Sequence, residues 1–166
     1  MIYDEENAIE DLLTLFTTKL DAEISIINTE KNAVLGDARF ISSIPQDKFI
    51  FETLDSRILN YTGFFVRYGF VDTPPSQVSE VNFIEDTTFY FEVCTFDNGE
   101  KARSNTFYKL LRYRKALRET LRKNPDVFRS FAKPLVASLK PTAFPYSNKS
   151  IILSIGLDIR ASMTAN

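Results

Sequence analysis

The sequence predicts an α+β fold, in which a mostly antiparallel sheet is packed by an N-terminal helix and by a second, basic helix. Near the N-terminus, apolar residues recur at the three- and four-residue spacing of an amphipathic helix. Three later segments alternate with the period of two that strands adopt, and a cationic helical segment precedes the last of them. The length of 166 residues, 44% of them hydrophobic, suits one globular domain. We therefore predict a single α+β domain over residues 1–166, with extended loops at about 28–61 and 124–149.

The first helix is expected from Asp4 to Leu20. Its buried stripe would consist of apolar residues at helical spacing: Ile9, Leu12, Leu13, Phe16 and Leu20. Carboxylates near its start offset the positive end of the helix dipole. The segment from Glu23 to Ile27 then fits either a short strand or a connection. Residues 28–47 show no clean period and are expected to be mostly loop, whereas residues 48–61 fit neither period well.

Strands are expected over Gly63–Val71, Thr87–Phe96 and Ser150–Arg160, where β-branched and aromatic residues are enriched and alternate between two faces. A loop should separate the first two strands, because Pro74 and Pro75 cannot donate to a sheet ladder. After the third strand, the last six residues are expected to form a frayed tail.

The second helix should begin with Ser104 or Asn105 as its N-cap and end at Asn124, since the residue before a proline avoids helical angles. Beyond it, four prolines between residues 125 and 145 argue against long regular structure. The aromatic residues among these prolines, which include Phe128 and Phe131, indicate a segment that packs against something instead of staying disordered.

Positive charge is concentrated between Lys101 and Lys123, where nine Lys or Arg stand against one acid, Glu119. The expected buried stripe of this helix is apolar: Phe107, Leu110, Leu111, Leu117 and Leu121. A separate row carries cations at helical spacing, and Arg112 lies outside it: Lys115, Arg118 and Arg122. Three interpretations of this row stay open: a solvated helix face, a docking face for an acidic protein surface, or a nucleic-acid contact.

The two parts of the chain carry opposite charge. Residues 1–100 hold 6 Lys and Arg against 19 Asp and Glu, whereas residues 101–166 hold 14 against 3. Such an asymmetry concerns partners more than fold. Identical copies that pack head to tail would satisfy both surfaces, with the opposite charges meeting across subunits and not within one.

The residue types present argue against the common catalytic and metal-binding arrangements. The chain has no histidine, the commonest general base and metal ligand. Its single cysteine, Cys94, cannot form an intrachain disulfide or an ordinary zinc site, and is expected to be a small buried residue of a strand. The five glycines are too dispersed for a phosphate-binding loop. We expect no enzymatic activity, no catalytic residue, no cofactor, no metal and, with no apolar run near about 18 residues, no membrane partner.

The order of these elements resembles the tail-terminator, or tail-completion, proteins of long-tailed bacteriophages. The resemblance rests on an acidic N-terminal helix, an aromatic strand with a V-R-Y-G centre (Val66 to Gly69), a proline-bearing loop, a second long strand, a basic helix and a closing strand. It covers the chain from about Asp4 to Arg160 and depends on element order without a signature motif.

The resemblance implies a non-enzymatic assembly protein of the virion, assembled in the host cytoplasm, that forms a homo-oligomeric ring, typically a hexamer. The ring would cap the tail tube protein and join it to the neck, connector or sheath proteins, with DNA only as passing cargo. The expected subunit and partner interface combines cations with aromatic residues: Arg112, Lys115, Arg118, Arg122, Phe65, Arg67, Phe128 and Phe131. The alternative function is a nucleic-acid-binding module that uses the basic helix over residues 101–123.

Overall fold

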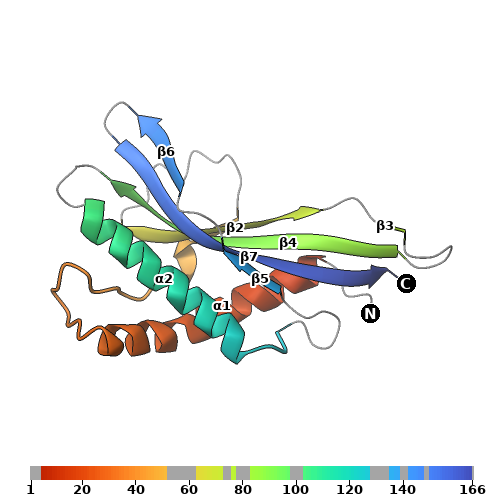
Figure 1. Ribbon diagram of the computed structural model, residues 1–166, viewed down its shortest axis with the longest axis horizontal. Helices are drawn as coiled ribbons and strands as arrows, with labels where there is room; N and C mark the ends of the chain where they lie inside the picture. The colour runs from red at the N-terminus through yellow and green to blue at the C-terminus, as the bar shows by residue number, and fades with distance from the viewer. Residues whose placement is uncertain are drawn as a thin grey trace.

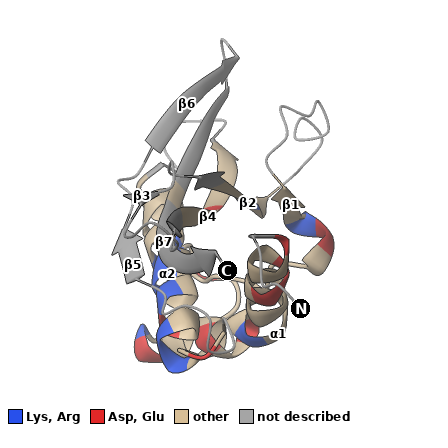
Figure 2. Ribbon diagram, turned by 90° about the vertical axis from the view of Figure 1, so that its right-hand side faces the viewer, with Lys and Arg blue, Asp and Glu red and all other residues tan. Residues whose placement is uncertain are grey.

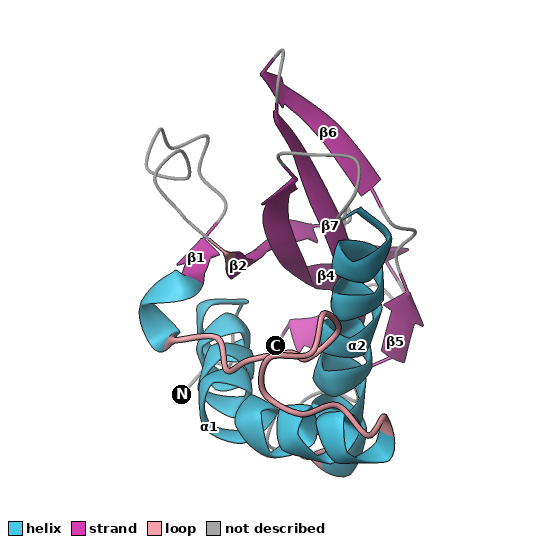
Figure 3. Cartoon of the chain, turned by 90° about the vertical axis from the view of Figure 1, so that its left-hand side faces the viewer, coloured by secondary structure: helices cyan, strands magenta, loops and turns pink. Residues whose placement is uncertain are grey.

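The computed structural model describes residues 5–51, 63–72, 76–77, 83–97, 103–127, 135–138, 142–147 and 150–165. Both helices lie on one face of a single curved sheet, which gives a two-layer α+β arrangement (Figure 1). Figure 3 shows the same layering from the left-hand side, with the helices below the strands. The predicted fold class is therefore confirmed.

The helices are α1 (Glu5–Glu30) and α2 (Arg103–Lys123), and a short 3-10 turn spans Gln46–Lys48. The described strands are β1 (Phe49–Phe51), β2 (Phe64–Asp72), β3 (Ser76–Gln77), β4 (Phe83–Asp97), β5 (Leu135–Ser138), β6 (Thr142–Ser147) and β7 (Ser150–Ala165). They form one sheet in the order β1-β2-β4-β7-β5, with β3 paired to β4 and β6 paired to β7. The β1–β2 pairing is parallel and the other pairings between described strands are antiparallel, as predicted for most of the sheet.

Helix α1 is longer than predicted and continues through the segment for which a strand or a connection was expected. The reason is that its buried stripe does not stop at Leu20, since Ile24 and Ile27 extend it at the spacing of four and three residues. All three side chains are less than 5% exposed. Burial of this stripe outweighs the weak preference of isoleucine for strands.

The prediction of a loop over 124–149 is wrong at β5 and β6, both of which pair with β7. Pro145 is tolerated in β6 because it lies next to an irregularity between Pro145 and Ser147, where the ladder is already interrupted. The predicted frayed tail is also strand: β7 reaches Ala165, which pairs with Phe83 at the start of β4. Residues 49–51 of the predicted 28–61 loop form β1.

Helix α2 ends after Lys123, as predicted, but it begins at Arg103, so Ser104 and Asn105 lie inside the first turn and are not the N-cap. At its end, the Asn124 side chain donates from Nδ2 to the Thr120 carbonyl at 2.7 Å. This contact satisfies one of the carbonyls that a helix end leaves without a partner.

The core lies between the two helices and the facing side of the sheet. Phe16 of α1 packs on Phe91 of β4 with ring centroids 4.7 Å apart, and Tyr113 of α2 packs on Phe64 of β2 at 5.0 Å. Further buried apolar strand residues on this side, among those described, are Val66, Phe89, Val93, Ile155 and Ile159. The opposite side of the sheet also contains buried residues, Phe65 and Cys94, each 1% exposed.

Candidate functional site

The segment after α1 is held against both helices by two pairs of hydrogen bonds. Asn28 of α1 donates from Nδ2 to the Ile41 carbonyl at 2.8 Å, and its Oδ1 accepts from the Ile41 N–H at 3.2 Å. Tyr113 of α2 donates from Oη to the Ser42 carbonyl at 2.8 Å and accepts from the Ser42 N–H at 3.1 Å. Burial raises the pKa of the Tyr113 phenol above its ordinary value of 10, so the hydroxyl stays a donor. We call residues 31–45 the clamped loop.

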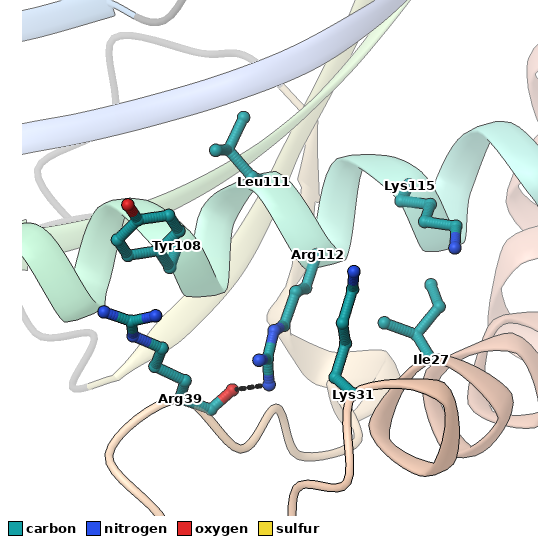
Figure 4. A pocket seen from close by; sticks show the side chains of 7 residues that line it. All are labelled: Ile27, Lys31, Arg39, Tyr108, Leu111, Arg112 and Lys115. Carbon is teal, nitrogen blue, oxygen red and sulfur yellow. Dashed lines mark hydrogen bonds between the residues drawn. The ribbon is translucent and has the colours of Figure 1, made fainter.

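A cleft of about 360 Å³ opens between α2, the end of α1 and the clamped loop. Its walls combine cationic and apolar side chains: Ile27, Lys31, Arg39, Tyr108, Leu111, Arg112 and Lys115. In Figure 4 the side chains of Arg112 and Lys31 lie next to one another between the loop and α2, and the Arg39 side chain extends toward Tyr108.

Each arginine of the cleft is oriented by a neutral group. The Arg39 guanidinium lies 4.0 Å from the centroid of the Tyr108 ring, and its Nε donates to Asn105 Oδ1 at 3.0 Å. Arg112 donates from Nη1 to the carbonyl of Arg39, the bond that is dashed in Figure 4. These contacts fix the position of both guanidinium groups without neutralising either charge.

One carboxylate borders the cleft. Glu30, the last residue of α1, accepts a 2.5 Å bond from Lys115 Nζ. The hydrogen bond and the charge of Lys115 hold the pKa of Glu30 below its ordinary value of 4.5, with a smaller contribution from the charge of Lys31. Among the described residues, the four cations that line the cleft therefore have one bonded carboxylate, Glu30.

The outer part of α2 carries a second cationic area, formed by Arg118 and Arg122, which we call the outer basic patch. Their side chains are 48% and 67% exposed, and both contact Glu119 on the same helix, at 3.6 and 2.7 Å. The hydrogen bond from Arg122 is the main cause that lowers the pKa of Glu119. Figure 2 colours the basic residues along α2 blue and the acidic residues along α1 red.

The structure divides the predicted interface residues into different groups. Arg118 and Arg122 are exposed, as a docking face requires, whereas Lys115 and Arg112 line the cleft. Phe65 is buried within the chain, with its ring 6.0 Å from that of Phe96, so it cannot supply an exposed aromatic contact.

Arg67 is likewise engaged within the sheet, because its Nε donates to Glu92 Oε2 at 3.1 Å. Glu92 of β4 is therefore paired with Arg67 across the two strands. Phe128 and Phe131 lie outside the described residues.

The expectation that opposite charges meet only across subunits is wrong for part of α2. Lys115 pairs with Glu30, and Lys123 pairs with Glu23 at 2.7 Å, so two of its cations meet acids of α1 in the same chain. The reason is that α1 and α2 pack against each other on the same face of the sheet (Figure 1). Acids of α1 therefore lie next to cations of α2.

The sequence prediction missed three cleft residues: Lys31, Arg39 and Tyr108. Lys31 and Arg39 lie in a segment without periodicity, and Arg39 meets Asn105 across 66 positions of the chain. Such a contact follows from the packing of the loop on α2, which no local spacing signals. The available hint was that Lys31 and Arg39 are two of only six cations in the acidic first 100 residues.

Within the part of the chain that the structure describes, no cluster of three or more His, Cys, Asp or Glu could hold a metal ion. Neither α1 nor α2 is long and apolar enough to cross a membrane, among the described residues. In the comparisons with known proteins, no family model and no curated protein matches this chain.

Proposed function

We propose that the protein is a non-enzymatic assembly protein that forms a ring of identical copies, of the kind that tail-terminator proteins place between a phage tail tube and the neck. The outer basic patch is the observation that carries this proposal. Arg118 and Arg122 have Glu119 as their only carboxylate partner within the described residues, which leaves a net positive charge on an exposed helix face.

Exposed carboxylates on α1 support an acidic surface as the other side of this contact. Glu6 and Glu10 are exposed on the first turns of α1, and Asp21 is exposed further along the same helix. Because the basic and acidic surfaces differ, one copy would join the next through unlike faces. Contacts of this kind build a closed ring when the rotation between neighbours divides a full turn.

Arginine suits such a contact better than lysine, since its planar guanidinium binds carboxylates in a bidentate way and is weakly hydrated. Glu119 orients both guanidinium groups before docking, so less side-chain freedom is lost when a partner binds. The ring would be completed by the tail tube protein on one face and by neck or sheath proteins on the other.

The mass of the particle in solution tests the ring. Native mass spectrometry of the purified protein should give a closed oligomer, and the Arg118→Glu/Arg122→Glu variant should shift it to monomer. Lys19→Glu, which reverses an exposed lysine on α1, serves as the control and should keep the oligomer. A native protein that stays monomeric at high concentration contradicts the proposal.

The second candidate is a nucleic-acid-binding module, and the cleft favours it, since Lys31, Arg39, Arg112 and Lys115 surround one space. Phosphate contacts release counterions, so the affinity for duplex DNA should fall steeply as salt rises. A mobility shift at low salt that disappears with added salt would support this function. The absence of any shift with micromolar protein at low salt would exclude it.

A further inference from the structure

We propose that the cleft binds a small organic phosphate, a function that the ring does not require. The site is separate from the outer basic patch, because its cations come from the clamped loop and from another part of α2. It therefore goes beyond the proposed ring and does not depend on it.

The charge of the cleft favours an anionic ligand. Among the described residues, Lys31 and the terminal nitrogens of Arg39 have no carboxylate partner, and Arg112 bonds a neutral carbonyl. Glu30 balances only one of the four cations. Phosphate suits a site of arginines and lysines, because its charged oxygens accept hydrogen bonds both from planar guanidinium groups and from ammonium groups.

The two guanidinium groups of the cleft are held in place before a ligand arrives. Arg39 lies two residues before Ile41, the residue that Asn28 fixes, and its guanidinium is fixed by Tyr108 and Asn105. Arg112 bonds the backbone of the same loop. Preorganised donors lose little freedom on binding, which increases affinity.

The remaining walls indicate that the ligand carries an apolar part. Ile27, Leu111 and the ring of Tyr108 line the cleft beside the cations. Its volume of about 360 Å³ exceeds what a bare phosphate needs and lies at the lower end of the range for small-molecule pockets, roughly 300–1,000 Å³. A phosphate joined to a ring or a short hydrocarbon fits both kinds of wall.

Glu30 acts as a competitor for the site. Its carboxylate already bonds Lys115, so an incoming phosphate must displace it to use that lysine. The Glu30 side chain is 50% exposed, and it can turn into solvent when displaced. Glu30→Gln should therefore tighten phosphate binding, because glutamine is neutral and competes less for Lys115. If the Glu30–Lys115 pair only stabilised the fold, this substitution would not increase the affinity for phosphate.

Calorimetric titration with phenyl phosphate and with inorganic phosphate tests the proposal, because the two probes share a head group and differ by one ring. Phenyl phosphate should bind one site per chain, about tenfold tighter than inorganic phosphate. Lys31→Gln/Arg39→Gln, at two exposed positions, should weaken it at least about tenfold. Glu30→Gln should tighten it several-fold.

The control is Arg118→Gln/Arg122→Gln, which removes two exposed arginines of the same helix outside the cleft. Unchanged affinity for phenyl phosphate in this variant supports the proposal. A loss of affinity equal to that of Lys31→Gln/Arg39→Gln overturns it, because binding would then depend on the total positive charge of the helix and not on the cleft. No saturable binding to either the native chain or Glu30→Gln also overturns it. Binding of duplex DNA without phenyl phosphate binding overturns it in favour of a nucleic-acid contact. None of these outcomes depends on the mass of the native oligomer.

Discussion

The clamp between α1 and the loop after it can be tested by one substitution, Asn28→Ala. The Asn28 amide bonds both backbone groups of Ile41, a residue with 0% exposure, so its removal leaves one buried N–H and one buried carbonyl without a partner. An unsatisfied buried group costs about 1–3 kcal/mol. Alanine is the better helix former by roughly 0.5 kcal/mol and offsets part of this cost. We expect the free energy of unfolding to fall by about 2–3 kcal/mol.

Urea unfolding measures this change. For a slope of about 2 kcal/mol per molar urea, the midpoint should move down by about 1–1.5 M while the slope stays constant. The matched control is Thr29→Ala at the next position, because the Thr29 hydroxyl bonds the Ser25 carbonyl at 3.0 Å on the exposed side of the same helix. This variant should change the free energy of unfolding by less than about 0.5 kcal/mol. If Asn28→Ala is as stable as the control, the clamp does not stabilise the fold and the reasoning is wrong.

Three further predictions concern other contacts. Tyr113→Phe keeps the ring packed but removes both bonds to the loop, and should lower the free energy of unfolding by about 1–2 kcal/mol in urea. Gly69→Ala places a methyl group against the ring and hydroxyl of Tyr90, so it should destabilise the sheet by about 1–3 kcal/mol. A double-mutant cycle should record a smaller loss in a Tyr90→Ala background. The pKa of Glu119 is lower in the folded chain than its ordinary 4.5, so its contribution to stability is complete above pH 4.5 and is lost as the pH falls through the lowered value. Acid titration of the unfolding midpoint should show a smaller acid loss for Glu119→Gln, and an unchanged profile would contradict the assignment.

The layers of the fold could be predicted from the sequence because each depends on a local period. The alternation within 63–71 and 87–96 follows from one face packing on helices, and β2 and β4 contain these residues except Gly63. The prolines after α2 were a poorer guide. They indicated a loop, but β5 and β6 form there because each can pair with the long strand β7. The residues of β5 and β6 show little strand pattern of their own, so the sequence did not predict these strands.

The sequence predicted the cationic row of α2, but it did not predict that Lys115 lines the cleft while Arg118 and Arg122 form the outer basic patch. Spacing within one helix cannot tell that Lys115 meets Glu30 while Arg122 stays exposed, since this depends on how α1 crosses α2. The buried position of Phe65 was missed for a similar reason. Alternation along β2 predicts two faces, and both are buried at this point of the sheet.

The position of β7 has a consequence for synthesis. This strand pairs with β4 over fifteen residues, from Phe83–Ala165 to Asp97–Ile151, yet it follows every other described element in the chain. Until the ribosome has released it, one border of β4 lacks its neighbour and can pair with another nascent polypeptide. Cells that make this protein should therefore accumulate insoluble material when translation stops before residue 150, even though both helices and the first strands have already been made.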